Sequence, residues 1–301
     1  MSLKYEIYFK IISNRLFCGS VTVSPLTPNN RTLYLGYTTT MKQFITHDID
    51  TILIDLDGVL YVGNDMIDGA DCTLKALPEQ GLKIAGLTNT TTQSRHDVAN
   101  KLATMGIPLT EADIYTPATL AKQKIAHHSA RLFIRDALRE DFTGIREDLE
   151  HPDYIVMGDM GGEGYAPEDL RDIFRLVMQD ATLLALHKNR FWQKPDGLHL
   201  DLGVFVTAIE YASNQHAIVL GKPSIDFFQH VCHALNTTPE HTGMVGDDIE
   251  SDIGGAQRAG LTGILVQTGK YRADFVQKSG IKPDHTIASI NDLCQLLSTG
   301  A

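Results

Sequence analysis

The stretch Thr51-Ile52-Leu53-Ile54-Asp55-Leu56-Asp57-Gly58-Val59-Leu60 decides the fold that we expect for this chain. Its first four residues are apolar or β-branched, which is typical of a strand buried on both faces of a parallel sheet. Asp55 and Asp57 follow, and because an unpaired buried carboxylate is costly, we expect them at the carboxyl end of the strand, where open α/β sheets have their active-site crevice. Two such carboxylates can share a divalent cation or divide the roles of nucleophile and acid/base. The alternative is an ordinary Asp-Gly turn.

Composition places the chain among ordinary globular proteins. It has 301 residues, of which 43% are hydrophobic and 21% charged, so it has room for two medium domains or one large one. The net charge of −11, from 26 basic and 37 acidic residues, disfavours nucleic acid as the main partner, because nucleic-acid binders usually carry a basic face. No apolar run approaches the roughly 20 residues that a transmembrane helix needs, so we expect no membrane association.

The cysteines favour a reducing compartment. The chain has four, none of them in a Cys-x-x-Cys pair, which disfavours a zinc site or a disulfide framework and predicts a cytoplasmic protein. They are Cys18, Cys72, Cys232 and Cys294. Lys10, Asn14 and Arg15 interrupt the apolar run that a signal peptide would require.

From Asp48 onward, apolar strands alternate with helical segments, the pattern of a doubly wound parallel sheet. The alternation restarts near Ser129 with a second α/β unit. The first pattern resumes after His216, beginning with a strand at 217–220. The simplest topology is one α/β domain that is interrupted by another.

The predicted domain organisation follows from this topology. It consists of a Rossmann-like core of residues 46–128 and 217–301, an inserted α/β domain of residues 129–216, and an N-terminal extension of residues 1–45 whose role is unclear. Within the extension, residues 5–12 alternate as an edge strand does.

Polar residues follow four of the predicted strands. They are Asp55 with Asp57, Thr88 with Asn89, Lys222, and Asp247 with Asp248 and Asp252. Because the carboxyl ends of parallel strands share one edge of a sheet, we expect these residues to meet in one crevice. Carboxylates without His or Cys partners suit a hard cation, Mg²⁺ above all. A lysine and a hydroxyl-amide pair suit a phosphoryl group, and a carboxylate nucleophile is a known means of phosphoryl transfer.

Each of these features also has an ordinary explanation. Thr88 and Asn89 are good helix caps, and Lys222 before a proline suits a solvated loop. Asp247 and Asp248 before a helix suit capping and the helix dipole. The ordinary explanation is favoured for each feature taken singly, but their joint occurrence after apolar strands favours a functional site.

On these motifs the chain resembles the phosphatases of the haloacid dehalogenase (HAD) superfamily. The matching segments are Asp55-x-Asp57-Gly58-Val59-Leu60, Thr88-Asn89, Gly221-Lys222-Pro223 and Gly246-Asp247-Asp248-x-x-x-Asp252. The match runs from about Asp48 to the C-terminus, and the inserted domain resembles the large α/β cap of the NagD-like subgroup. The resemblance implies a HAD core with a cap, and a carboxylate at position 57 distinguishes phosphatases from dehalogenases.

The resemblance implies catalytic and metal-binding roles for three aspartates. Asp55 would attack phosphorus and become an aspartyl-phosphate. Asp57 would protonate the leaving group and then take a proton from the hydrolytic water. Mg²⁺ would be held by the carboxylates of Asp55 and Asp247 and by the backbone carbonyl of Asp57.

The other motif residues would act on the phosphoryl group or behind the metal ligands. Thr88 and Asn89 would hydrogen-bond the phosphoryl oxygens, and Lys222 would neutralise charge on the intermediate. Asp248 and Asp252 would orient the metal's waters or Lys222.

The cap would close over the crevice and supply substrate contacts. The candidates are His187, Lys188, Arg190, Trp192, Lys194, Asp196, His199 and Asp201. Cations beside an aromatic ring suit an anionic or planar substrate, and the alternative for each residue is a solvated loop.

The function that these inferences predict is Mg²⁺-dependent hydrolysis of a small phosphorylated compound. By resemblance, this compound would be a phosphomonoester, a phosphoamide or pyrophosphate, and the enzyme would form a homodimer through the cap. Two alternatives stay open, a phosphotransferase or mutase of the same superfamily and a binding protein with a vestigial site.

Overall fold

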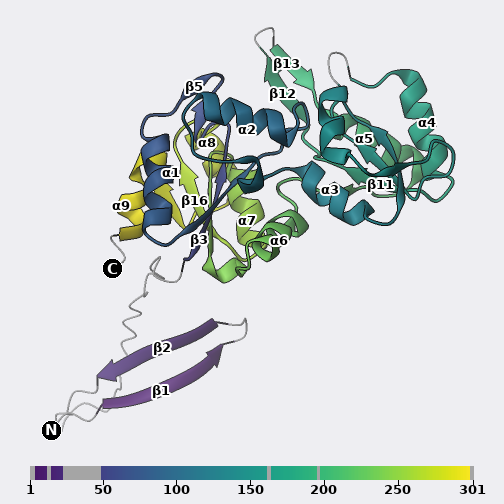
Figure 1. Cartoon of the computed structure of the whole chain (residues 1–301). Coiled ribbons are helices and arrows are strands. Elements are labelled where there is room, and N and C mark those ends of the chain that lie inside the picture. Colours follow the sequence, from purple (N-terminus) through teal and green to yellow (C-terminus); the bar gives the residue numbers. More distant parts are fainter. Residues whose placement is uncertain (1–3, 12–14, 23–48, 161–163, 195–196, 299–301) are drawn as a thin grey trace. The chain divides into compact units, whose positions relative to one another are not determined.

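The computed structural model describes residues 4–11, 15–22, 49–160, 164–194 and 197–298 (Figure 1). The chain divides into two units, Met1–Ile45 and Thr46–Ala301. In the first unit, β1 (Lys4–Ile11) and β2 (Arg15–Thr22) form an antiparallel pair. The sequence predicted the first of these strands, and the second was not expected.

The second unit contains a six-stranded parallel core sheet with the order β17-β16-β15-β3-β6-β7. Its strands are β3 (Thr51–Asp55), β6 (Lys83–Leu87), β7 (Ile114–Tyr115), β15 (Thr242–Gly246), β16 (Thr262–Val266) and β17 (His285–Ile287). All five residues of β3 are buried, and the strand lies between β6 and β15. The predicted parallel α/β fold is therefore confirmed, with the acidic pair at the end of a central strand.

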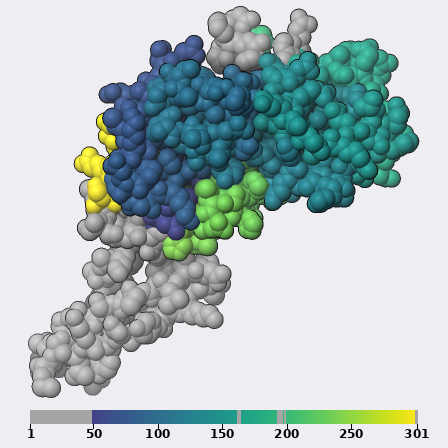
Figure 2. Space-filling view, in the orientation of Figure 1, coloured from purple at the N-terminus to yellow at the C-terminus, as the bar shows by residue number. Residues whose placement is uncertain are grey.

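Helices cover both faces of the core sheet, as a doubly wound fold requires. They are α1 (Ala70–Glu79), α2 (Arg95–Thr104), α3 (Pro117–Ile125), α6 (Ile225–Ala234), α7 (Gly255–Arg258), α8 (Ala273–Ser279) and α9 (Leu293–Ser298). Ile52 and Ile54 pack on the side of α1, α2 and α9, whereas Leu53 packs with α3 and α6, because alternate strand residues point to opposite faces. In the space-filling view, the blue part of the chain that includes α1 and α2 covers one of these faces (Figure 2).

A separate five-stranded parallel sheet, the cap sheet, has the order β14-β11-β10-β8-β9. Its strands are β8 (Ser129–Phe133), β9 (Arg146–Glu147), β10 (Tyr154–Met157), β11 (Thr182–Ala185) and β14 (Ile218–Val219). Helices α4 (Pro167–Val177) and α5 (Leu202–Ser213) bury one apolar side each against it. An antiparallel hairpin, β12 (Phe191–Lys194) and β13 (Gly197–Leu200), precedes α5, and a smaller one, β4 (Tyr61–Val62) and β5 (Asp65–Met66), follows β3.

The strand predicted at 217–220 belongs to the cap sheet and not to the core sheet. The part that forms a strand, β14, pairs with β11, Leu184 lying opposite Ile218. A two-residue apolar strand looks the same in the sequence whichever sheet it joins, so only its hydrogen-bonded pairing shows to which sheet it belongs. The cap sheet therefore extends to Val219, three residues beyond the predicted end of the inserted domain.

One buried apolar cluster joins the two sheets. It runs from Leu53 and Leu87 of the core sheet, past α3, to Leu132, Val156 and Leu184 of the cap sheet. Within the described residues, no helix has the length and apolarity that crossing a membrane would take.

Candidate active site

The predicted site residues lie at or shortly after the carboxyl ends of parallel strands. Asp55 is the last residue of β3 and Asp57 lies two residues further on, and Thr88 and Asn89 follow β6. Asp247 and Asp248 follow β15, and Asp252 lies in the helical turn Ile249–Gly254 that comes next. Lys222 follows β14, so it reaches the core from the last strand of the cap sheet. The site is thus assembled from both sheets.

Lys222 lies between two carboxylates. Its Nζ is 2.6 Å from Asp55 Oδ1 and 2.7 Å from Asp252 Oδ1. All three side chains are buried, and that of Lys222 is only 3% exposed. Burial lowers the pKa of Lys222, but the charges of Asp252 and Asp55 outweigh burial and raise it. Lys222 is therefore a permanent cation beside Asp55.

Asp247 contributes a carboxylate oxygen that lacks a partner in the part of the chain that the structure describes. Its Oδ2 accepts a hydrogen bond of 2.7 Å from the backbone N–H of Lys270, whereas its buried Oδ1 has no hydrogen-bond partner among the described residues. Burial and the charges of Asp55 and Asp252 raise the pKa of Asp247 to about 8. An unsatisfied buried carboxylate oxygen is costly, which favours a cation at this position.

The carboxylate cluster fits a hard divalent cation. Oxygens of Asp55, Asp247 and Asp252 lie within 4.8 Å of one another. Asp252 is already engaged, because Lys222 contacts Oδ1 and the backbone N–H of Asp248 donates to Oδ2 at 3.1 Å. Burial raises the pKa of Asp252 to about 6, against the lowering effect of Lys222. The donor set is all oxygen, as Mg²⁺ prefers.

Asp57 differs from Asp55 in its surroundings. It is exposed where Asp55 is buried. Partial desolvation and the charge of Asp55 raise its pKa, and Lys270 and Lys101 oppose this shift. A carboxyl group whose pKa is raised holds its proton closer to neutral pH, which suits a general acid.

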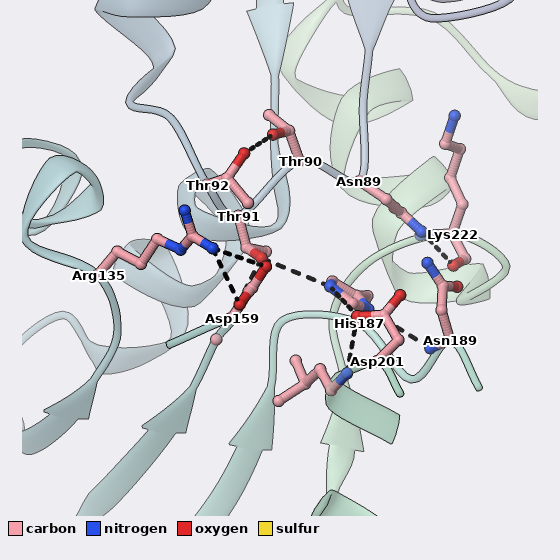
Figure 3. Close-up of polar contacts among 12 residues, drawn as sticks. Asn89, Thr90, Thr91, Thr92, Arg135, Asp159, His187, Asn189, Asp201 and Lys222 are labelled. Atoms are coloured by element: carbon pink, nitrogen blue, oxygen red, sulfur yellow. Dashed lines mark hydrogen bonds and ion pairs between the residues drawn. The ribbon is translucent and has the colours of Figure 1, made fainter. Parts of the chain in front are cut away.

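The two residues after β6 have different environments. Thr88 is buried, and its Oγ1 accepts a hydrogen bond of 3.1 Å from the backbone N–H of Thr90. The side chain of Asn89 bonds the backbone of Lys222 at both ends, because Nδ2 donates to Lys222 O and Oδ1 accepts from Lys222 N, each at 2.8 Å (Figure 3). Asn89 therefore holds the lysine in place, and its expected contact with a phosphoryl oxygen stays a prediction.

The cap candidates are placed in three different ways. His187 and Asp201 are mostly buried and face one another, His187 Nε2 lying 3.8 Å from Asp201 Oδ1. Lys188 is exposed and pairs with Glu210 at 2.5 Å, and exposed Arg190 lies beside the ring of Phe191. His199 is half-buried on β13. The side chains of Trp192 and Lys194, and all of Asp196, lie outside the described residues.

The loop of residues 268–270 completes the site, and sequence reasoning gave it no role. Thr268 Oγ1 donates to the carbonyl of Gly58 at 2.5 Å, and the Lys270 N–H binds Asp247. Gly269 has φ +57°, and a Cβ there would overlap Asp247 Oδ2 and lie 2.5 Å from Gly58 Cα. A Thr-Gly-Lys segment two residues after a buried strand was the available signal.

Gly269→Ala tests the close approach of this loop. The added methyl must displace Asp247 or the Gly58 turn, so we expect Mg²⁺ affinity to fall at least about tenfold, as for lost outer-shell support of a metal site. Isothermal titration calorimetry with MgCl₂ measures the affinity.

Gly280→Ala is the matched control for this substitution. Gly280 is also left-handed (φ +69°), but no atom lies within 4 Å of a Cβ there. Both variants have similar backbone strain, about 1 kcal/mol. Equal Mg²⁺ affinity in the two variants would show that the Gly269 contact does not matter.

Two family models match the chain. The haloacid dehalogenase-like hydrolase model matches residues 52–146, and a HAD-hydrolase-like model matches residues 219–293. Between them lie the strands β10 and β11 of the cap sheet and the helices α4 and α5.

Named relatives cover most of the chain. Haloacid dehalogenase-like hydrolase domain-containing protein 2 of Bos taurus is 38% identical over 243 residues, which is 80% of this chain and 93% of that protein. Phospholysine phosphohistidine inorganic pyrophosphate phosphatase of Homo sapiens is 32% identical over 254 residues, 82% of this chain and 93% of that protein.

Solved structures share the fold. NagD of E. coli K-12 superimposes with a TM-score of 0.73 at 25% identity, over 81% of this chain and 98% of that chain. The 4-nitrophenylphosphatase of Thermotoga maritima gives a TM-score of 0.78 at 22% identity, over 84% and 98% of the two chains. The resemblance drawn from the motifs is confirmed, and the chain belongs to the haloacid dehalogenase-like hydrolases, as an enzyme of the NagD-like type.

Proposed function

We propose that the chain is a Mg²⁺-dependent phosphatase that hydrolyses a small phosphorylated compound through an aspartyl-phosphate on Asp55. The observation that carries this proposal is the 2.6 Å contact between Asp55 and the buried cation Lys222, beside Asp247 Oδ1, which has no hydrogen-bond partner in the described part of the chain. A nucleophile, a fixed positive charge and a cation-seeking oxygen are the parts that phosphoryl transfer needs.

The first half of the reaction forms the aspartyl-phosphate. A carboxylate oxygen of Asp55 attacks phosphorus, and the bond from phosphorus to the leaving atom breaks. Asp57 donates its proton to that leaving atom. Lys222 offsets charge on the phosphoryl oxygens, and Thr88, at the end of β6, offers a hydroxyl to one of them.

The second half returns the enzyme to its starting state. Asp57, now a carboxylate, takes a proton from water, whose oxygen attacks phosphorus. The bond between phosphorus and Asp55 breaks, which releases inorganic phosphate and restores both carboxyl groups. Mg²⁺, held by Asp55, Asp247 and the Asp57 carbonyl, would neutralise charge on the phosphoryl oxygens.

The substrate class is part of the proposal. One relative is named for phospholysine, phosphohistidine and inorganic pyrophosphate, and neighbouring structures are named for 4-nitrophenyl phosphate. We propose that this chain acts on a small compound of one of these phosphate classes. The homodimer through the cap and the cytoplasmic location stay predictions.

Asp55→Asn tests the nucleophile. An amide cannot form the acyl-phosphate, so we expect phosphate release to fall at least about 10³-fold and acid-quenched phosphoenzyme to disappear. The panel contains 4-nitrophenyl phosphate, pyrophosphate, phosphohistidine and phospholysine, each with MgCl₂ and with EDTA. Asp136→Asn, which changes a fully exposed carboxylate, is the control.

The results of this panel separate the functions. Turnover retained in Asp55→Asn would overturn the nucleophile assignment. Transfer of phosphate to added alcohols, with little free phosphate, would indicate a phosphotransferase. Mg²⁺ binding without any turnover would indicate a binding protein.

A metal-free sample should lose stability as pH rises from 6.5 to 8. The pKa of Asp247 is about 8 in the folded state against an ordinary value of 3.8, so at pH 6.5 the folded state binds a proton that the unfolded state does not. The free energy of unfolding therefore falls as this proton is lost when pH rises toward 8. The slope is at most about 1.4 kcal/mol per pH unit for one such group.

Mg²⁺ should remove this loss, because it takes the place of the proton on Asp247. Thermal unfolding with EDTA and with MgCl₂ at both pH values measures the effect. In Asp247→Asn both the pH slope and the Mg²⁺ response should shrink. A metal-free protein that gains stability over this range would contradict the charge assignment.

A further inference from the structure

The carboxyl ends of three cap strands face the core loop of residues 88–92, which follows β6. Arg135, Asp159 and His187 come shortly after β8, β10 and β11 (Figure 3). The backbone N–H of Asp159 donates to Thr91 Oγ1 at 3.3 Å, and the Asp159 carboxylate lies 3.5 Å from Arg135. His187 Nε2 is 3.4 Å from the same Thr91 Oγ1. One hydroxyl of the core thus meets two strand ends of the cap.

The surroundings of His187 define its hydrogen bonds. Its Nδ1 accepts from the backbone N–H of Asn189 at 3.4 Å, so the neutral ring has its proton on Nε2. In this tautomer Nε2 donates to Thr91 Oγ1 at 3.4 Å, and Asp201 Oδ1 lies 3.8 Å from the same nitrogen. The side chain is only 5% exposed, and both nitrogens have partners within the protein. A substrate would have to displace one of these partners to reach the ring.

The contact leads directly to the catalytic lysine. Thr91 is two residues from Asn89 in the same loop. Asn89 holds the backbone of Lys222 at both ends, and Lys222 Nζ binds Asp55. The position of His187 in the cap is therefore connected, through Thr91 and Asn89, to the position of the charge beside the nucleophile.

We infer that Thr91 and His187 are positioning residues, which set the 88–92 loop, and through it Lys222, by a hydrogen bond between core and cap. This assigns His187 a role different from the substrate contact that the sequence suggested. The apolar cluster that joins the two sheets is non-directional, whereas a hydrogen bond between two buried side chains fixes one register. The inference deepens the proposed function and rests on it.

Electrostatics are consistent with a neutral donor at this position. Burial lowers the pKa of His187, and the charges of Asp201 and Asp159 only partly oppose this effect, while Lys270 adds to it. Arg135 pairs with Asp159 and offsets part of its charge. His187 is therefore neutral at physiological pH and donates through Nε2.

Thr91→Val tests the inference, because valine keeps the shape of threonine and removes only the hydroxyl. We expect kcat to fall about tenfold with KM changed less than about twofold, since a small displacement of a catalytic group lowers the rate without removing substrate binding. Thr91→Ser, which restores the hydroxyl, should recover most of kcat. Thr92→Val is the matched control, because the Thr92 hydroxyl contacts only Thr90 at 3.2 Å among the described residues.

His187 is tested by a second pair of variants. A glutamine side chain would place an amide N–H near the position of Nε2, so His187→Gln should retain most of kcat, whereas His187→Leu should resemble Thr91→Val. Amide hydrogen exchange of residues 88–92 is the readout that does not depend on turnover. We expect faster exchange in Thr91→Val and His187→Leu than in the wild type, Thr91→Ser or Thr92→Val.

The outcomes distinguish this inference from the proposed function. Wild-type protein without turnover would overturn the proposed function, and loop exchange would still test the contact. An active wild type with unchanged kcat and unchanged exchange in Thr91→Val would overturn the inference alone. Equal losses in Thr91→Val and Thr91→Ser would also overturn it, because they would show a packing effect and not a hydrogen bond.

Discussion

Burial of the Lys222 ammonium between Asp55 and Asp252 is the interaction on which the site depends. A charge removed from water is costly, and two carboxylates at 2.6 and 2.7 Å compensate for it. A buried ion pair of this kind adds little net stability, but it allows few other arrangements, because any displacement leaves a charge without its partner. Lys222 must therefore stay beside Asp55, and the segment that carries it is constrained in turn.

The same charge balance explains why two neighbouring carboxylates are suited to different tasks. Asp252 has an oxygen on Lys222 and another on the Asp248 N–H, so its charge is already compensated. Asp247 has one oxygen on the Lys270 N–H and another without a partner among the described residues, and its pKa is raised further than that of Asp252. Position in the hydrogen-bond network, more than distance, thus leaves an oxygen of Asp247 open to a cation among the described residues and ties Asp252 to Lys222.

Much of this arrangement could be predicted from the sequence, since the carboxyl ends of parallel strands share one edge. Asp55 ends an apolar strand, and Thr88 and Asp247 each follow one, so one rule was enough to bring them together. The same rule does not predict that Gly269 belongs to the site, because Gly269 enters it through its close approach to Gly58, which is far away in the chain. Nor does it show that both ends of the Asn89 side chain are used by Lys222. No periodic pattern in the sequence shows which side chains contact one another across the fold, and none shows that β14 pairs with β11.

The return of the chain from cap to core shows how tightly the two are joined. A Cβ at Gly221 would lie 2.6 Å from Asn89 Oδ1 and 2.7 Å from the carbonyl of Leu186, so the segment passes between the core loop and the end of β11 with no room for a side chain. The residue after this glycine is Lys222, and the residue after Leu186 is His187. Lys222 and the buried His187 of the cap therefore leave the same close crossing, one toward Asp55 and the other toward Thr91. Because interiors packed this closely transmit displacement, a shift of the cap at this crossing must also displace Lys222 relative to Asp55.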